Sequence, residues 1–280
     1  MRTKRKDAAE SAGSTGSAGS GSGAARGDGA QSGTAPTGTV QSVERAFHVL
    51  EALADAEGAL PLSELAAATR LPQPTAHRLL RTMEELGYVR QLDTRSYALG
   101  PGLIRLGSRA TPPLAARAQP IMVELEEIAR ETVNLAVLDG DRVAYIGQVP
   151  SRHQMRMFTE VGRRVLPHSA GVGKAILSML PETRVREIVG RTGMPRFTPT
   201  TITGIDALIA DLRESRRRGF AVDDGEREVG VRCIAVPVPG SAPPAALSIS
   251  GPSARVDDDL ARTITDALLA AAARLAEEIG

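Results

Sequence analysis

The stretch that most constrains the fold is LPQPTAHRLLRTMEELGYV, which runs from Leu71 to Val89. It opens with two prolines around Gln73, continues with apolar residues at helical spacing, and stops at Gly87. Pro74 suits the first helical position because its missing N–H would be unpaired there, and glycine suits a helix end. The same helix carries His77, Arg78 and Arg81. The stretch therefore predicts a short helix whose outer face is either simply solvated or built for an anionic partner.

Two further helices and a hairpin surround this stretch. VQSVERAFHVLEALAD has an apolar stripe that includes Val43 and Phe47, with Ser42 as the expected N-cap, and PLSELAAATR predicts a second helix. YVRQLDTRSYALG has two short apolar runs around residues 93–95, which is typical of a hairpin. The order helix, helix, tight turn, helix, hairpin predicts a winged helix-turn-helix at residues 40–100.

A winged helix of this kind is expected to bind double-stranded DNA through its third helix and its wing. The predicted DNA-contacting residues are Gln73, Thr75, His77, Arg78, Arg81, Arg90 and Arg95. Local charge argues against tight binding, because residues 40–108 hold seven Arg and eight Asp or Glu, a net charge of −1. Two modules in a dimer, each with its arginines on one face, resolve this conflict. The alternative is a winged-helix module used for protein contacts only.

Composition sets the outer bounds on function. The 280 residues carry 34 basic and 33 acidic side chains, so the net charge of +1 neither favours nor excludes a nucleic-acid partner. The one cysteine, Cys233, excludes an internal disulfide and fits a reducing compartment. No apolar run approaches the roughly 18 residues of a membrane span, and no apolar stretch follows the basic N-terminus. We expect a cytoplasmic protein with no membrane partner, and a disordered Gly/Ser/Ala-rich tail at residues 1–39.

The remainder of the chain predicts a second domain. A linker helix at residues 101–119 is broken by Pro112-Pro113, and an amphipathic helix is expected to begin at Pro120. An Asp139-Gly140 turn indicates a hairpin. Further strands are expected at 154–159, 220–223, 231–238 and 245–250, and helices at 172–180, 182–190, 205–218 and 256–278. A mostly antiparallel sheet with helices packed against it makes residues 120–280 a separate α+β domain.

Six blocks in this order resemble the IclR family of bacterial transcription regulators. They are VERAFHVLEAL, LPLSELAAATRLPQPTAHRLLRTMEELGYV, YALGPGLIRLG, PHSAGVGKAIL, RRRGFAVDDGEREVGVRCIAVPV and ALSISGP. The resemblance covers residues 40–279. It implies an α+β chain in which an N-terminal winged helix-turn-helix is joined by a linker helix to a GAF/PAS-like effector domain with a mostly antiparallel sheet.

The resemblance also implies a function. It implies a ligand-responsive transcription factor, expected to be a repressor, that binds operator DNA and has no enzymatic activity. It implies a homodimer through the winged-helix half and linker helix, and often a homotetramer through the effector half.

Two positions depart from the family pattern: Pro74 stands where a polar residue commonly precedes Thr75, and Gln154 stands where members that bind small oxo-acids prefer an apolar residue.

The effector site is predicted around SAGVGKA and the last two strands. Backbone N–H groups of Gly171 and Val172, at the start of a helix, offer an anion site, although a tight-packing glycine turn is an alternative. Ser248 and Ser250 face the same side of a strand, which is either a pocket or a solvated face. In oxo-acid-binding members the resemblance assigns ligand contacts to Met157, Gly171, Val172, Asp223, Val231, Cys233, Ser248 and Ser250. We expect a small carboxylate such as glyoxylate or pyruvate, held without Lys or Arg.

The sequence leaves two other chemistries open as alternatives to an effector site. Cys233 with His168 and Asp223 could form a nucleophilic set, which would make the chain a small-molecule hydrolase. Against it, VRCIAV puts the thiol in the middle of an apolar strand, where a cysteine is usually neutral and inert. Metal binding through His153, His168 and Cys233 lacks ligand spacing, so we expect neither a metal nor a cofactor.

Overall fold

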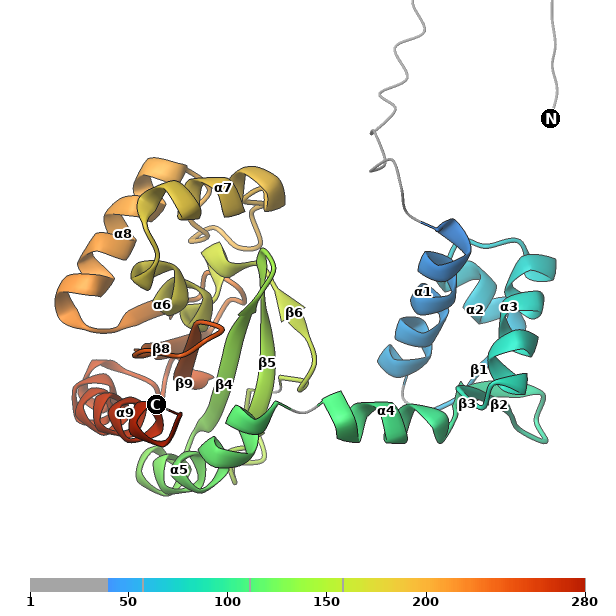
Figure 1. Ribbon diagram of the computed structural model, residues 1–280, viewed down its shortest axis with the longest axis horizontal. Coiled ribbons are helices and arrows are strands. Elements are labelled where there is room, and N and C mark those ends of the chain that lie inside the picture. The colour runs from blue at the N-terminus through green and yellow to red at the C-terminus, as the bar shows by residue number, and fades with distance from the viewer. Residues whose placement is uncertain (1–39, 57, 111, 158, 280) are drawn as a thin grey trace, which may run out of the picture. The chain divides into compact units, whose positions relative to one another are not determined.

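The chain forms two compact units, Met1–Leu99 and Gly100–Gly280 (Figure 1). The computed structural model describes residues 40–56, 58–110, 112–157 and 159–279. The tail predicted to be disordered, residues 1–39, lies outside the described residues.

The first unit combines three helices with a small antiparallel sheet. The helices are α1 (Gln41–Asp55), α2 (Leu62–Ala68) and α3 (Gln73–Glu85), and the strands are β1 (Leu60–Pro61), β2 (Val89–Gln91) and β3 (Ser96–Leu99). The strand order is β1-β3-β2. The core consists of Val49, Leu53, Leu65, Leu80, Met83, Val89 and Tyr97. The predicted helix, helix, turn, helix, hairpin order is confirmed, and β1 is an addition that the sequence pattern did not indicate.

Helix α1 differs from its prediction in its cap and in its buried face. It begins at Gln41 with Val40 as N-cap and no side-chain capping bond, so the expected cap at Ser42 is wrong. Val49 and Leu53 face the core, whereas Val43 and Phe47 are 51% and 59% exposed. The apolar stripe of α1 is therefore wider than its own unit can cover.

The second unit contains a six-stranded antiparallel sheet in the order β6-β5-β4-β9-β8-β7. Its strands are β4 (Thr132–Asp139), β5 (Arg142–Val149), β6 (Arg164–Val165), β7 (Ala221–Asp224), β8 (Val231–Val238) and β9 (Ala245–Pro252). Its helices are α4 (Gly102–Ala110), α5 (Pro113–Ala129), α6 (Gly171–Met179), α7 (Glu182–Thr192), α8 (Ile205–Arg218) and α9 (Asp258–Ile279), with a 3-10 turn at Pro167–Ser169.

Helices cover both faces of this sheet. On one face α5 and α9 bury the largest apolar cluster, which includes Ile121, Met122 and Leu268. On the other face α6 packs through Val172 and Ile176, and α7 and α8 pack outside α6 (Figure 1). Helix α6 is thus enclosed between the sheet and an outer helical layer, which explains why an apolar helix such as GVGKAILSM is stable there.

Two predicted elements of this unit are wrong. The amphipathic helix begins at Pro113, and Pro120 lies inside it. Pro113 is favourable at the first position of a helix. Burial of Ala115 and Ala118 stabilises the helical turns before Pro120, although Pro120 has no N–H to donate within the helix. The described residues of 154–159 form no strand, because most of their side chains are exposed and no sheet partner covers them. The short strand β6 forms instead, beside β5.

Candidate functional site

Helix α3 presents most of the predicted DNA-contacting residues to solvent. Gln73, His77, Arg78 and Arg81 are exposed and Thr75 is half-buried, while Ala76, Leu80 and Met83 are buried. The helix begins at Gln73, one residue before the predicted start, so Pro74 occupies the second helical position. Neither position needs an N–H within the helix, so the proline is accommodated without loss. One face of α3 is therefore fixed by the core and the other is free to contact DNA.

The two arginines of α3 differ in their surroundings. The Nε of Arg81 lies 3.1 Å from Oε1 of Glu85, one turn further along the helix. Arg78 has no side-chain hydrogen bond or ion pair within the part of the chain that the structure describes, and its side chain is exposed. Arg81 must give up part of its pairing with Glu85 to reach DNA, whereas Arg78 gives up nothing. Arg78 is the stronger candidate for a base contact.

The wing carries the other two predicted DNA contacts. Arg90 on β2 and Arg95 at the hairpin tip are both exposed. The N–H of Arg95 donates to the carbonyl of Leu92 at 2.8 Å. Arg95 has a φ of +62°, in the left-handed region, which turns the chain so that the N–H of Leu92 donates to the carbonyl of Ser96 at 2.8 Å. The wing is tied to α3, because the N–H of Gln91 donates to Oε1 of Glu84 at 3.1 Å. This hydrogen bond joins the wing to the C-terminal half of α3.

We expect the wing arginines to contact phosphate rather than bases. Replacing Arg90 or Arg95 by alanine should weaken binding to specific and non-specific duplexes alike, and should lower the slope of log affinity against log salt by about 1 for each arginine lost. Fluorescence anisotropy at several salt concentrations measures both effects. A variant that relaxes preference at one operator base pair, with an unchanged salt slope, would show instead that the wing reads sequence.

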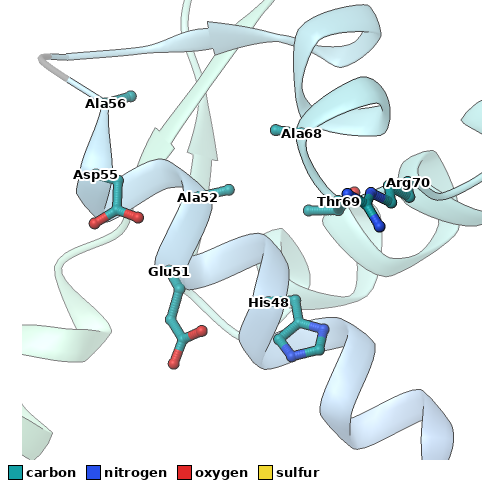
Figure 2. A pocket seen from close by; sticks show the side chains of 8 residues that line it. All are labelled: His48, Glu51, Ala52, Asp55, Ala56, Ala68, Thr69 and Arg70. Atoms are coloured by element: carbon teal, nitrogen blue, oxygen red, sulfur yellow. The ribbon is translucent and has the colours of Figure 1, made fainter. Parts of the chain in front are cut away.

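A shallow pocket of about 560 Å³ lies between α1 and α2 (Figure 2). Its lining includes His48, Glu51 and Asp55 from α1 and Arg70 at the end of α2. None of the seven predicted DNA-contacting residues lines it. Glu51 and Asp55 disfavour phosphate there, although Arg70 also lines the pocket, so we do not assign it to the predicted DNA surface.

In the second unit, the strand register brings polar residues into one row. Asp223 on β7 pairs with Cys233 on β8, and Cys233 pairs with Ser250 on β9. Directly paired residues point to the same face of a sheet, and this is the face that α6 covers. The exposed fractions of the three side chains are only 5–6%. A solvated face is therefore excluded for this row.

The N-terminus of α6 approaches the row closely. A Cβ added at Gly171 would lie 2.7 Å from Sγ of Cys233, so only glycine allows this contact. The first three N–H groups of a helix have no partner within the helix, and the earliest α6 bond runs from the N–H of Lys174 to the carbonyl of Ala170 at 2.9 Å. The N–H groups of Gly171 and Val172 are thereby brought beside Cys233. Both readings of the glycine turn, tight packing and anion site, are compatible with this geometry.

Two buried hydroxyls near these elements have few protein partners among the described residues. Ser248, opposite Ala235 on β8, and Ser169, just before α6, are both fully buried. Oγ of Ser169 has no hydrogen-bond partner in this part of the chain, and Oγ of Ser248 interacts there only with the thiol of Cys233. Buried hydroxyls are normally paired, so an unpaired one calls for an explanation such as a bound ligand. Ser169 was missed by the sequence reasoning, although it opens the SAGVGKA motif.

The two remaining predicted ligand residues, Met157 and Val231, lie at the edge of the predicted effector site. The carbonyl of Met157 accepts a hydrogen bond from Oγ1 of Thr132 at 3.1 Å, and Thr132 pairs with Ser250. Val231 begins β8 and is half-buried, two residues before Cys233 and therefore on the same face. Gln154, the departure from the family pattern, is exposed.

Burial is the largest cause of the pKa shifts of Asp223 and Cys233. Burial raises the pKa of Asp223 to about 7, although its Oδ1 accepts a 2.7 Å hydrogen bond from the N–H of Glu226. Burial, together with the nearby Asp223 charge, raises the pKa of the Cys233 thiol to about 11. A thiol with so high a pKa is protonated at neutral pH and is a poor nucleophile. The hydrolase alternative therefore has no reactive thiolate to support it.

A buried charge cluster beside the row was missed by sequence reasoning. Nζ of Lys174, on α6, lies 2.5 Å from Oε1 of Glu226 and 3.2 Å from Oδ2 of Asp211 on α8. The signal was present, because Lys174 is the one charged residue in the apolar segment AGVGKAIL. Within the described ranges no group of three or more His, Cys, Asp or Glu is arranged to hold a metal ion. No helix in the same ranges is long and apolar enough to cross a bilayer.

Comparison with known proteins decides the family. Residues 110–277 match the family described as bacterial transcriptional regulator IclR C-terminal, and residues 42–93 match the IclR helix-turn-helix domain. The chain belongs to the IclR family. The transcriptional repressor IclR of Escherichia coli is 41% identical over 234 residues, which cover 81% of this chain and 85% of that protein.

Solved IclR-family structures share the fold. The IclR of Thermotoga maritima has a TM-score of 0.71 and 28% identity, and the match covers 86% of this chain and 99% of that chain. An IclR homolog from Microbacterium hydrocarbonoxydans, complexed with 4-hydroxybenzoate, has a TM-score of 0.67 and 25% identity over 85% of this chain and 99% of that one. The predicted fold class, a helix-turn-helix followed by an α+β effector domain, is confirmed. The chain is a transcriptional regulator and not an enzyme.

Proposed function

We propose that this IclR-family member is a cytoplasmic repressor that binds operator DNA as a dimer and responds to a small carboxylate such as glyoxylate or pyruvate. Helix α3 and the wing contact the DNA, and the effector binds between the N-terminus of α6 and strands β7–β9. The observation that carries the proposal is the buried row Asp223, Cys233 and Ser250, which lies beside the N-terminus of α6. Within the described residues the N–H groups of Gly171 and Val172 donate no hydrogen bond. The Escherichia coli protein described as transcriptional repressor IclR is 41% identical to this chain, which supports repression rather than activation.

The chemistry of the row suits a small anion. The N–H groups of Gly171 and Val172, with the hydroxyls of Ser248 and Ser250, provide several short donors for one carboxylate. The neutral thiol of Cys233 forms a weakly polar wall against the carbon skeleton. Effector binding changes DNA affinity only through a difference in affinity between two dimer arrangements, typically about 1–3 kcal/mol.

The test is calorimetry on the full chain with glyoxylate, pyruvate and 4-hydroxybenzoate. We expect the small acids to bind, and Ser248→Ala to weaken them about 10- to 150-fold, the cost of losing a hydrogen bond to a charged group. Ser253→Ala, at an exposed serine just after β9, is the matched control and should bind normally. Tighter binding of 4-hydroxybenzoate than of either small acid, or small-acid binding that survives Ser248→Ala, would overturn the small-acid site.

The proposed dimer rests on the apolar face that α1 leaves uncovered. In the first unit, Val40, Val43 and Phe47 are each more than half exposed. Exposed apolar side chains gathered on one helix face commonly mark a protein interface. In the second unit, none of the nine residues of α4, all of them described, is buried, so α4 offers a separate surface. Phe47→Glu should shift the protein to monomers in analytical ultracentrifugation. Met179→Glu, an equivalent change at an exposed position of α6, should remain dimeric, and a dimeric Phe47→Glu would place the interface elsewhere.

A further inference from the structure

Lys174, Asp211 and Glu226 form a buried ion cluster that joins three elements. Lys174 belongs to α6, Asp211 to α8, and Glu226 to the loop between β7 and β8. The side chains of Lys174 and Glu226 are 1% and 9% exposed, and Oε2 of Glu226 has no hydrogen-bond partner among the described residues. Burying charges in this way is costly unless they are paired, so the cluster fixes the loop to α6.

The cluster is linked directly to Asp223. The N–H of Glu226 donates to Oδ1 of Asp223 at 2.7 Å, so the residue that Lys174 holds also holds Asp223. The charged and titratable groups around Asp223 come from four elements: Tyr145 on β5, Cys233 on β8, Lys174 on α6, and Glu226 and Arg227 on the loop. Tyr145 and Cys233 are neutral at pH 7, because burial raises the pKa of both.

We propose that Asp223 takes up one proton from solvent when an anionic effector binds, and that Glu226, held by Lys174, is the positioning residue that sets the pH at which this happens. This inference rests on the proposed effector site. The effector enters as a carboxylate with a charge of −1, and the Asp223 carboxylate gains H⁺ to become a carboxyl group. The two charges cancel, so the total charge of the site does not change.

The geometry favours this proton. A carboxylate bound beside Asp223 would place two negative charges in a buried site, which strongly raises the pKa of one of the two groups. A protonated Asp223 removes the repulsion and becomes a hydrogen-bond donor to the ligand. The nearby Glu226 carboxylate favours the protonated form of Asp223, while Lys174 and the backbone N–H oppose it. Because burial has already raised the pKa of Asp223 to about 7, the proton is available near neutral pH at little cost.

A defined pH dependence follows. Below the pKa of the free protein Asp223 is already protonated, so affinity should be independent of pH. Above that pKa, and until the higher pKa of the complex is reached, each pH unit should weaken binding about tenfold, because one proton must be taken up. The probe is glyoxylate, titrated into the full chain between pH 6 and pH 9. Two buffers with different ionisation enthalpies then give the number of protons bound at pH 8, which should approach one.

Three variants separate this coupling from simple damage. Asp223→Asn keeps the shape and a donor group, so glyoxylate should bind with an affinity that no longer depends on pH. Glu226→Gln removes the charge that favours protonation, so it should bind as well as wild type at pH 6 but more weakly at pH 8. Glu182→Gln, which breaks an exposed ion pair with Arg213, is the matched control and should follow the wild-type profile.

The outcomes are distinct. Failure of wild-type protein to bind glyoxylate or pyruvate at any pH overturns the proposed effector site and this inference with it. Binding with pH-independent affinity overturns the proton coupling and leaves the effector site standing. If Glu226→Gln loses the same factor at pH 6 and pH 8, with an intact circular dichroism spectrum, Glu226 has a structural role only and its assignment is wrong.

Discussion

Replacing Arg78 by alanine should weaken operator binding about 5- to 150-fold, the equivalent of about 1–3 kcal/mol for loss of one bidentate base contact. Arg78 is exposed on α3 and is committed to no ion pair among the described residues, so its guanidinium can reach a base edge without breaking another contact. The opposite side of the helix is anchored by Ala76, Leu80 and Met83. The substitution should therefore change DNA binding and leave folding intact.

The measurement is a titration of the operator against full-length protein, with the same duplex carrying single base-pair changes. If Arg78 reads a guanine, the alanine variant should also lose discrimination at that one base pair. Arg213→Ala, at an exposed arginine of α8 in the other unit, is the control and should bind DNA normally. Unchanged operator affinity for Arg78→Ala, with an intact circular dichroism spectrum, would remove Arg78 from the reading surface.

Local patterns located most elements of both units. Helix α8, with apolar residues at regular helical spacing, matches its prediction at 205–218, and β8 matches at 231–238. These elements succeed because each has one continuous buried face and a clear glycine or turn signal at its end. The prediction of a hairpin at Asp139-Gly140 is also correct, because the turn places Gly140 at a φ of +62°, which glycine adopts readily.

The features that escaped prediction depend on tertiary contacts. Pro120 was expected to begin a helix, yet packing of Ala115 and Ala118 extends the helix upstream of it. Lys174 was read as part of a glycine turn, because its two partners are 37 and 52 residues away in the sequence. A local sequence pattern cannot predict which carboxylates, distant in the sequence, will surround a buried lysine. The proposed effector site could thus be outlined from its glycines and serines, but its electrostatics could not.

The packing of α6 on β8 leads to the second large effect. Gly171→Ala should destabilise the effector unit by about 1–3 kcal/mol, because the new Cβ would lie 2.7 Å from Sγ and 3.2 Å from Cβ of Cys233. To relieve that overlap, α6 must move away from the strand. The N–H groups that the proposed effector needs would then move too, so glyoxylate binding should be lost along with stability. Thermal unfolding and calorimetry on the full chain measure the two effects.

A compensating change makes this prediction specific. Cys233→Ala removes Sγ, the nearest atom, so the double variant Gly171→Ala with Cys233→Ala should recover most of the stability that Gly171→Ala alone loses. Gly190→Ala on α7 is the matched control, since nothing lies within 4 Å of its added Cβ and its backbone is helical, so it should be neutral or slightly stabilising. The two changes at 171 and 233 share one contact and should not be additive. If the losses of stability in the double variant were additive, α6 would not pack on Cys233 as described. The proposed anion site at the N-terminus of α6 would then also be wrong.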